Sequence, residues 1–209
     1  VTLLAVDFAM RRDLKSSKVW LEKIPFFVLS IIFGIVAIYA QQSSKSIVTD
    51  TAVGNRIFFA SYGFMQYIFK LVAPVNLSVF YPYPTTETLP AHFYIYPFLV
   101  LAVIGGLIYA IKKNYRLAAF GILFFSINIF LLLQLLPVGK AIMADRYSYI
   151  PSIGFFLLVG LGYKLVVQYF SGKQAVQYAM IAVLIAYSGW LGYKTYDRTE
   201  VWESSMSLW

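Results

Sequence analysis

The chain has 209 residues, of which 60% are hydrophobic and 12% are charged, whereas soluble domains carry roughly a quarter charged residues. Its formal net charge of +8 would suit nucleic acid, but the basic residues lie in short connectors between apolar runs, as the positive-inside rule predicts for a membrane protein. The absence of cysteine excludes a disulfide framework and a thiolate metal site. We therefore expect a membrane protein without a nucleic-acid partner.

Apolar runs of a length suited to membrane-spanning helices recur along the chain. Residues 1–10 read as the end of a truncated span, and 11–23 form a basic connector in which Trp20 would anchor a short interfacial helix. The sequence predicts full spans at 24–40, 94–111, 117–136, 150–168 and 176–193. Dense prolines between positions 74 and 90 exclude a regular helix there and indicate a loop.

The orientation of the chain follows from its basic connectors. Residues 11–23, 112–116 and 164–173 carry ten of the 17 Lys and Arg residues, which places these three segments on the cytoplasmic side. Segment 56–72 must then begin and end on the outer side. Four residues interrupt its apolar pattern, namely Arg56, Ser61, Gln66 and Lys70, and they favour an interfacial or re-entrant helix.

These assignments define the fold class as all-α, a polytopic transmembrane helical bundle. We predict about five full spans, one truncated span and one interfacial or re-entrant helix. The membrane domain would occupy 1–193, and 194–209 would begin an outward-facing helical repeat region. The apolar start of the chain, and its abrupt stop at "RTEVWESSMSLW" in what resembles the beginning of a helix, suggest a piece of a longer protein.

The outward loop "PVGKAIMADRYSYIPSIGF" places Lys140, Asp145 and Arg146 at the membrane surface, where phosphate groups of lipids and lipid-linked sugars lie. Arg binds phosphate bidentately and Lys adds a point charge, while Asp145 could hold Arg146 or act as a base. Alternatively, these charges could only end the helices and form a local pair. We assign this loop, including Tyr147, to substrate binding.

The proline-rich loop contains "FYPYP", and its Tyr81 and Tyr83 suit contacts with sugar rings or lipid tails. An interfacial aromatic belt is the more common reason for such residues. His92 is the single histidine of the chain, so it gives little support for a metal site. The predicted spans hold almost no ionisable residues, which argues against an ion-coupled transporter.

Four stretches in order carry a family resemblance: "DFAMRRDLKSSKVWLEKIPFF", "KLVAPVNLSVFYPYP", "ADRYSYIPSIGF" and "VWESSMSLW". Together they resemble the membrane half of polytopic proteins with C-terminal tetratricopeptide repeats. That group includes the transmembrane and tetratricopeptide-repeat O-mannosyltransferases and their bacterial relatives. The resemblance covers nearly all of the chain, and the bacterial relatives look closer.

The resemblance implies a GT-C glycosyltransferase that moves a sugar from a polyprenyl-phosphate carrier to an acceptor, expected to be protein, on the non-cytoplasmic side. It implies a bacterial inner-membrane location, a periplasmic C-terminus, and a protein or peptide acceptor held by the following repeats, which Trp202 and Trp209 would begin. In that family the catalytic acid precedes Val1, so the catalytic residues stay unassigned. No cofactor is expected in this fragment, and a divalent metal is left open for the full-length protein.

Two other functions remain open from the sequence. A related envelope polysaccharide polymerase or ligase would share the phosphate site, but it would be expected to have large outer loops and no repeats. A scaffold subunit of a membrane complex would use the same surface without catalysis.

Overall fold

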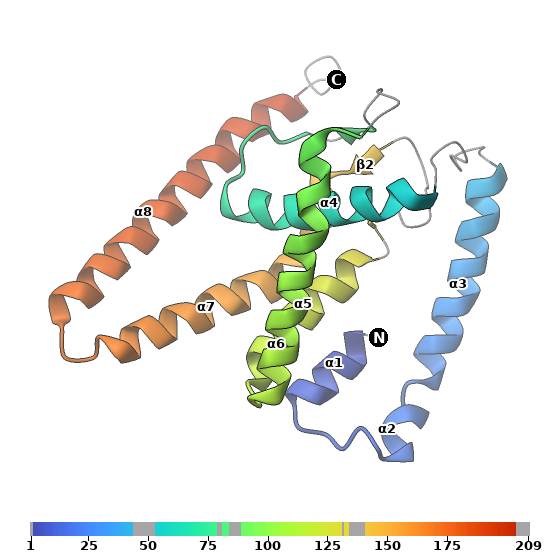
Figure 1. The fold of residues 1–209 in the computed structure, drawn as a ribbon, viewed down its shortest axis with the longest axis horizontal. Coiled ribbons are helices and arrows are strands. Elements are labelled where there is room, and N and C mark those ends of the chain that lie inside the picture. Colours follow the sequence, from blue (N-terminus) through green and yellow to red (C-terminus); the bar gives the residue numbers. More distant parts are fainter. Residues whose placement is uncertain are drawn as a thin grey trace.

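The computed structural model describes residues 2–43, 53–78, 81–83, 89–130, 132–133 and 141–203. It is mostly helical, and its long helices extend from a central group of crossing elements (Figure 1). Within the described residues, four segments are long and apolar enough to cross a membrane: Ser17–Ala40, Ala91–Lys112, Ser152–Tyr169 and Gln174–Thr199. The chain is an integral membrane protein.

The helices and strands follow one another in this order: α1 (Thr2–Ala9), α2 (Ser17–Leu21), α3 (Ile24–Ser43), α4 (Val53–Val72), β1 (Tyr81–Pro82), the 3₁₀ turn η1 (Ala91–Ile95), α5 (Tyr96–Lys112), α6 (Arg116–Phe130), β2 (Ala141–Met143), η2 (Asp145–Ser148), α7 (Ser152–Tyr169), α8 (Gln174–Thr199) and η3 (Glu200–Trp202).

Four of the five predicted spans correspond to α3, α5, α7 and α8, and the short helix expected around Trp20 is α2. The fifth prediction, 117–136, differs from the structure because α6 ends at Phe130 and is 15 residues long. At 1.5 Å per residue, α6 covers about 22 Å of a hydrocarbon core that is about 30 Å thick. The count of five full spans therefore stays a prediction.

The segment expected to lie at the interface forms α4, which is not among the four candidate spans and runs crosswise to α3 and α5 in Figure 1. Its inner face packs on α5 and α6. Phe64 packs edge-on against Phe125 of α6, with ring centroids 5.3 Å apart, and Ile129 and Met143 complete this buried core. Helix α4 therefore lies across the ends of α5 and α6 and buries its apolar face against them.

A short antiparallel pairing departs from the all-α expectation. Tyr81 of β1 lies opposite Met143 of β2, and Pro82 lies opposite Ala141. Each strand is only two or three residues long, which agrees with the prolines that limit hydrogen bonding in this loop. The pairing brings the proline-rich loop beside the segment that leads to Asp145.

Two of the basic connectors begin with the same helix-ending turn. Asn114 and Arg11 adopt left-handed backbone angles, with φ of 58° and 60°. After α5, Tyr115 N donates to Ala110 O at 2.8 Å and Asn114 N donates to Ile111 O at 3.0 Å; Arg12 N donates to Asp7 O in the same way after α1. These Schellman turns satisfy the last carbonyls of each helix and leave basic side chains at the negative end of the helix dipole.

A buried ion cluster joins α1 to the beginning of α3. The Asp7 carboxylate pairs with Lys23 Nζ, and both side chains are almost fully buried. Arg12 bridges Asp7 at 3.1 Å and Glu22 at 2.7 Å. Removing one partner of such a buried pair would leave an uncompensated charge, so the cluster fixes the first connector.

Two glycines allow α6 and α7 to cross closely. A Cβ placed on Gly154 of α7 would lie 2.6 Å from Gly121 O and 2.8 Å from Phe125 N of α6. Small residues allow this approach of two backbones in a membrane, where the packing itself stabilises helix association. The α6–α7 contact is the most extensive helix contact within the described residues.

We expect Gly154→Ala to separate α7 from α6, because the added methyl group would overlap backbone atoms. Overpacking of this kind costs roughly 1–3 kcal/mol. Gly160→Ala on the same helix is the matched control, since a Cβ there meets nothing within 4 Å. Thermal unfolding in detergent should show a lower midpoint for Gly154→Ala alone; equal midpoints would contradict the crossing.

Candidate functional site

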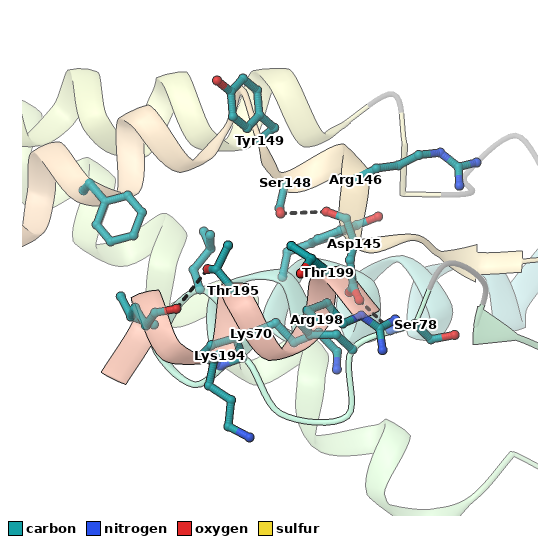
Figure 2. Close-up of a pocket in the computed structure, with 16 residues that line it drawn as sticks. Lys70, Ser78, Asp145, Arg146, Ser148, Tyr149, Lys194, Thr195, Arg198 and Thr199 are labelled. Atoms are coloured by element: carbon teal, nitrogen blue, oxygen red, sulfur yellow. Dashed lines mark hydrogen bonds between the residues drawn. The ribbon is translucent and has the colours of Figure 1, made fainter. Parts of the chain in front are cut away.

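A pocket of about 650 Å³ opens where the ends of α4, α7 and α8 meet the η2 turn (Figure 2). Four of its lining residues are basic and one is acidic: Lys70, Arg146, Lys194, Arg198 and Asp145. Its remaining wall is largely apolar, with Leu71, Leu77, Phe156 and Leu191 among the lining residues. The pocket therefore joins a basic region to an apolar one.

The Asp145 carboxylate links η2 to the proline-rich loop. It accepts a hydrogen bond from Ser78 N at 2.6 Å, and the Tyr81 hydroxyl lies 3.0 Å from both carboxylate oxygens. The same hydroxyl lies 2.9 Å from Asn76 O, so its single hydrogen is shared between these acceptors. These contacts hold a half-buried negative charge in one orientation.

Tyr67 of α4 also holds the turn that carries Asp145, through the neighbouring residue Ala144. Its side chain is 1% exposed, and its hydroxyl donates to Ala144 O and accepts from Ala144 N, both at 3.2 Å. Burial raises the pKa of Tyr67 to about 12, so the phenol stays neutral and keeps both hydrogen bonds at physiological pH. The position of Asp145 therefore depends on α4 as well as on its own loop.

Two cations face this carboxylate. Lys70 Nζ donates to Val75 O at 3.1 Å and to Asn76 O at 3.0 Å, and it lies 4.8 Å from the centre of the Tyr81 ring. Arg198 reaches the same place from the last turn of α8 (Figure 2). Both side chains are half-buried, so their charges are less screened than those of a solvated surface.

The electrostatics of these groups are coupled. Burial raises the pKa of the Asp145 carboxyl, while the hydrogen bonds from Ser78 and Tyr81 and the charges of Lys70 and Arg198 act in the opposite direction. Burial likewise lowers the pKa of Lys70, against the attraction of Asp145. The pKa of Tyr81 is raised by burial and by the neighbouring carboxylate, which keeps Tyr81 a hydrogen-bond donor.

The residues predicted from the sequence have different surroundings. Asp145 and Arg146 line the pocket, and Tyr81 contacts Asp145 directly. The exposed Arg146 side chain points away from Lys70 and Arg198 in Figure 2, and its guanidinium lies 4.9 Å from the centre of the Tyr147 ring. A pair between Asp145 and Arg146 is thus not how the structure satisfies the carboxylate. The predicted roles of these residues in binding stay predictions.

Tyr83 lies outside this pocket. Its ring packs edge-on against Phe59 of α4, with centroids 5.2 Å apart, beside the buried Phe93. Lys140 and Trp209 lie outside the described residues, as does the side chain of Trp202. Within the described part of the chain, no group of three or more His, Asp or Glu side chains gathers as a metal site would require, and the prediction about metals stays untested.

Lys70, Lys194 and Arg198 are site residues that the sequence pattern does not predict. In the sequence, Lys70 stands out only as an interruption of an apolar segment. Lys194 and Arg198 were placed after the last span, yet α8 continues through the predicted domain boundary at 193 to Thr199. Their spacing of four residues puts them on one helix face. The segment 193–203 contains neither Pro nor Gly, so the sequence gives no reason for the helix to end at 193.

One curated protein supports an enzymatic interpretation. The chain is 25% identical over 220 aligned positions to a protein O-mannosyl-transferase of Caenorhabditis elegans. The alignment covers 99% of this chain and 30% of the relative, so the chain spans less than a third of that protein's length. No protein-family model and no solved structure matches the chain. Together with the spans, this distant similarity supports a membrane protein resembling glycosyltransferases.

Because the pKa of Asp145 is raised, we expect the stability of the folded protein to depend on pH. Between its ordinary value of 3.8 and its higher folded value, the folded state binds more protons than the unfolded state, so stability falls as pH rises through that window. Comparing thermal midpoints of the protein and of Asp145→Asn across the window should show this loss in the unmodified protein only. Parallel curves would contradict the buried-carboxylate interpretation.

Proposed function

We propose that the chain is the membrane part of a glycosyltransferase of the GT-C type. It would move a sugar from a polyprenyl-phosphate carrier to an acceptor, expected to be a protein or peptide. The observation that carries the proposal is the pocket in which Lys70 and Arg198 face the half-buried Asp145 at the end of the membrane helices. The similarity to an O-mannosyl-transferase supports the reaction class.

The proposed reaction requires a departing phosphate to be stabilised. The acceptor hydroxyl oxygen forms a bond to the anomeric carbon of the sugar, and the bond from that carbon to the phosphate oxygen breaks. The electron pair leaves with the phosphate, and the hydroxyl proton passes to a base that is not assigned among these residues. Fixed cations aimed at the phosphate favour the transition state because negative charge grows there during the step.

Asp145 has a positioning role in this proposal. Its carboxylate holds the Ser78 backbone and the Tyr81 ring, and Lys70 packs over that same ring. The carboxylate also attracts both Lys70 and Arg198, which opposes their mutual repulsion when the pocket is empty. In this proposal Asp145 therefore helps to hold Lys70 and Arg198 in the same pocket.

The acceptor side and the cellular location belong to the same proposal. The basic connectors at α1–α2, α5–α6 and α7–α8 lie towards the lower side of Figure 1, and the pocket elements lie towards the upper side. By the positive-inside rule the pocket would face away from the cytoplasm. The location that we propose is a bacterial inner membrane, with the C-terminus in the periplasm. Repeats following position 194 would hold the acceptor.

A transfer assay with the full-length protein and a polyprenyl-phosphate sugar tests the function. Arg198→Ala should lower kcat by about 100-fold, as expected when one preorganised charge contact with the transition state is lost. Arg146→Ala should have a smaller effect, because its side chain points away from the cations that face Asp145. Lys112→Ala, at the opposite end of α5, is the matched control.

Full transfer by Arg198→Ala would contradict the proposed charge stabilisation. If the unmodified protein binds the carrier and transfers nothing to any acceptor, the scaffold alternative is favoured instead.

Because the chain has no cysteine, single cysteines report the orientation directly. In oriented vesicles, a membrane-impermeant thiol reagent should label Lys113→Cys and Lys173→Cys from the cytoplasmic side and Tyr147→Cys from the other side. All three substituted side chains are exposed. Labelling of Tyr147→Cys and Lys113→Cys from the same side would refute the proposed orientation.

A further inference from the structure

Arg116 joins two basic connectors that are distant in the sequence. From the start of α6, its Nη1 donates to Phe8 O of α1 at 3.4 Å, and its guanidinium lies 5.5 Å from the centre of the Phe8 ring. Arg11 N donates to the same carbonyl at 3.3 Å, so the backbone of Arg11 lies beside the Arg116 side chain. Arg116 Nε also donates to Asn114 Oδ1 at 3.0 Å, next to Lys113. These contacts gather Arg11, Lys113 and Arg116, the basic patch, where α1 meets the ends of α5 and α6 (Figure 1).

The positive charge of the basic patch is not balanced by neighbouring carboxylates. Within the part of the chain that the structure describes, none of its three members forms an ion pair with Asp or Glu. The nearby Asp7 and Glu22 carboxylates are already paired in the buried ion cluster, and Asp13 accepts a hydrogen bond from Lys15 N. The ends of α1 and α5 add about half a negative charge each. Together with Asp13, these ends do not cancel three cations.

An exposed face of α5 leads to the basic patch. Ala102, Gly106, Tyr109 and Lys113 follow one another at spacings of four, three and four residues, which places them on one face of the helix. All four are exposed, and a Cβ on Gly106 would meet no atom within 4 Å. Tyr109 packs edge-on against Tyr115, with ring centroids 6.3 Å apart. Because Tyr is typical of the headgroup level of a bilayer, this face changes from apolar to cationic at the depth where lipid headgroups lie.

We propose that an anionic phospholipid binds at this place, with its phosphate against the basic patch and an acyl chain along the exposed face of α5. The patch lies at the opposite end of the bundle from the pocket, and the inference does not depend on the proposed function. Charge complementarity selects an anionic headgroup, as at other basic sites between membrane helices. The contacts above use two of the five N–H donors of Arg116, and the others suit phosphate oxygens.

A titration of the protein in detergent, read by mass spectrometry of intact protein–lipid complexes, tests this inference. The probe is dioleoyl phosphatidylglycerol. Dioleoyl phosphatidylcholine has the same chains and a headgroup without net charge, and glycerophosphoglycerol has the same headgroup without chains. Phosphatidylglycerol should bind at least about tenfold more tightly than phosphatidylcholine, because only its phosphate brings net negative charge to the cations. Glycerophosphoglycerol should compete only at far higher concentrations, since it leaves the α5 face uncovered.

Two double variants that remove equal charge separate a defined site from general attraction to basic connectors. Arg11→Gln combined with Lys113→Gln should weaken phosphatidylglycerol binding about 25-fold, because each basic residue near an anionic headgroup contributes about fivefold. Lys164→Gln combined with Lys173→Gln is the matched control, because Figure 1 shows the α7–α8 turn far from the basic patch. It should change binding less than about twofold, since distant exposed charges are screened.

All four substituted side chains are exposed, so both double variants should unfold at the temperature of the unmodified protein. Lys113→Gln alone provides the test if Arg11→Gln lowers that temperature. Three results would overturn the inference. Equal binding of phosphatidylglycerol and phosphatidylcholine would remove the role of charge, and equal binding of glycerophosphoglycerol would indicate a site for soluble phosphates. An equal loss of binding in the two double variants would show general electrostatic attraction without a site at the patch.

Discussion

The half-buried carboxylate of Asp145 is the interaction on which the pocket end of the molecule depends. A charge removed from water must be compensated, and here Ser78 N, Tyr81 and the cations Lys70 and Arg198 compensate it. Those partners come from the proline-rich loop, from α4 and from α8, which are far apart in the sequence. One carboxylate therefore organises elements that share no extended packing with one another.

The lipid environment explains why this polar cluster is needed. Helices such as α3 and α8 expose almost all of their apolar side chains, and burial between helices contributes little to placing them. In a bilayer, specific polar contacts and close backbone packing set the arrangement because lipid tails are as apolar as the side chains. The structure uses both, with Asp7–Lys23 and Asp145 at opposite ends and the Gly121–Gly154 crossing between them.

Much of the helical architecture could be predicted from the sequence, because an apolar run of about 20 residues has few alternatives to a spanning helix. The polar interruptions of 56–72 likewise indicated the different character of α4. The pocket could be predicted only in part. Asp145 and Arg146 stand out in an apolar chain, whereas Lys70 and Arg198 gain their significance from a meeting of α4 with α8 that no local pattern encodes. The partners of Asp145 depend on the same long-range meeting.

The glycine crossing has a consequence for the region beyond it. Gly154 lies at the beginning of α7, so the tight contact with α6 fixes only that end of the hairpin, and Tyr187 supplies one further attachment to α4. The remaining apolar side chains of α7 and α8 are largely exposed, and in a bilayer they would face acyl chains. The surrounding bilayer thus acts as a structural component of this protein. We expect the positions of α7 and α8 to change when a detergent replaces the bilayer.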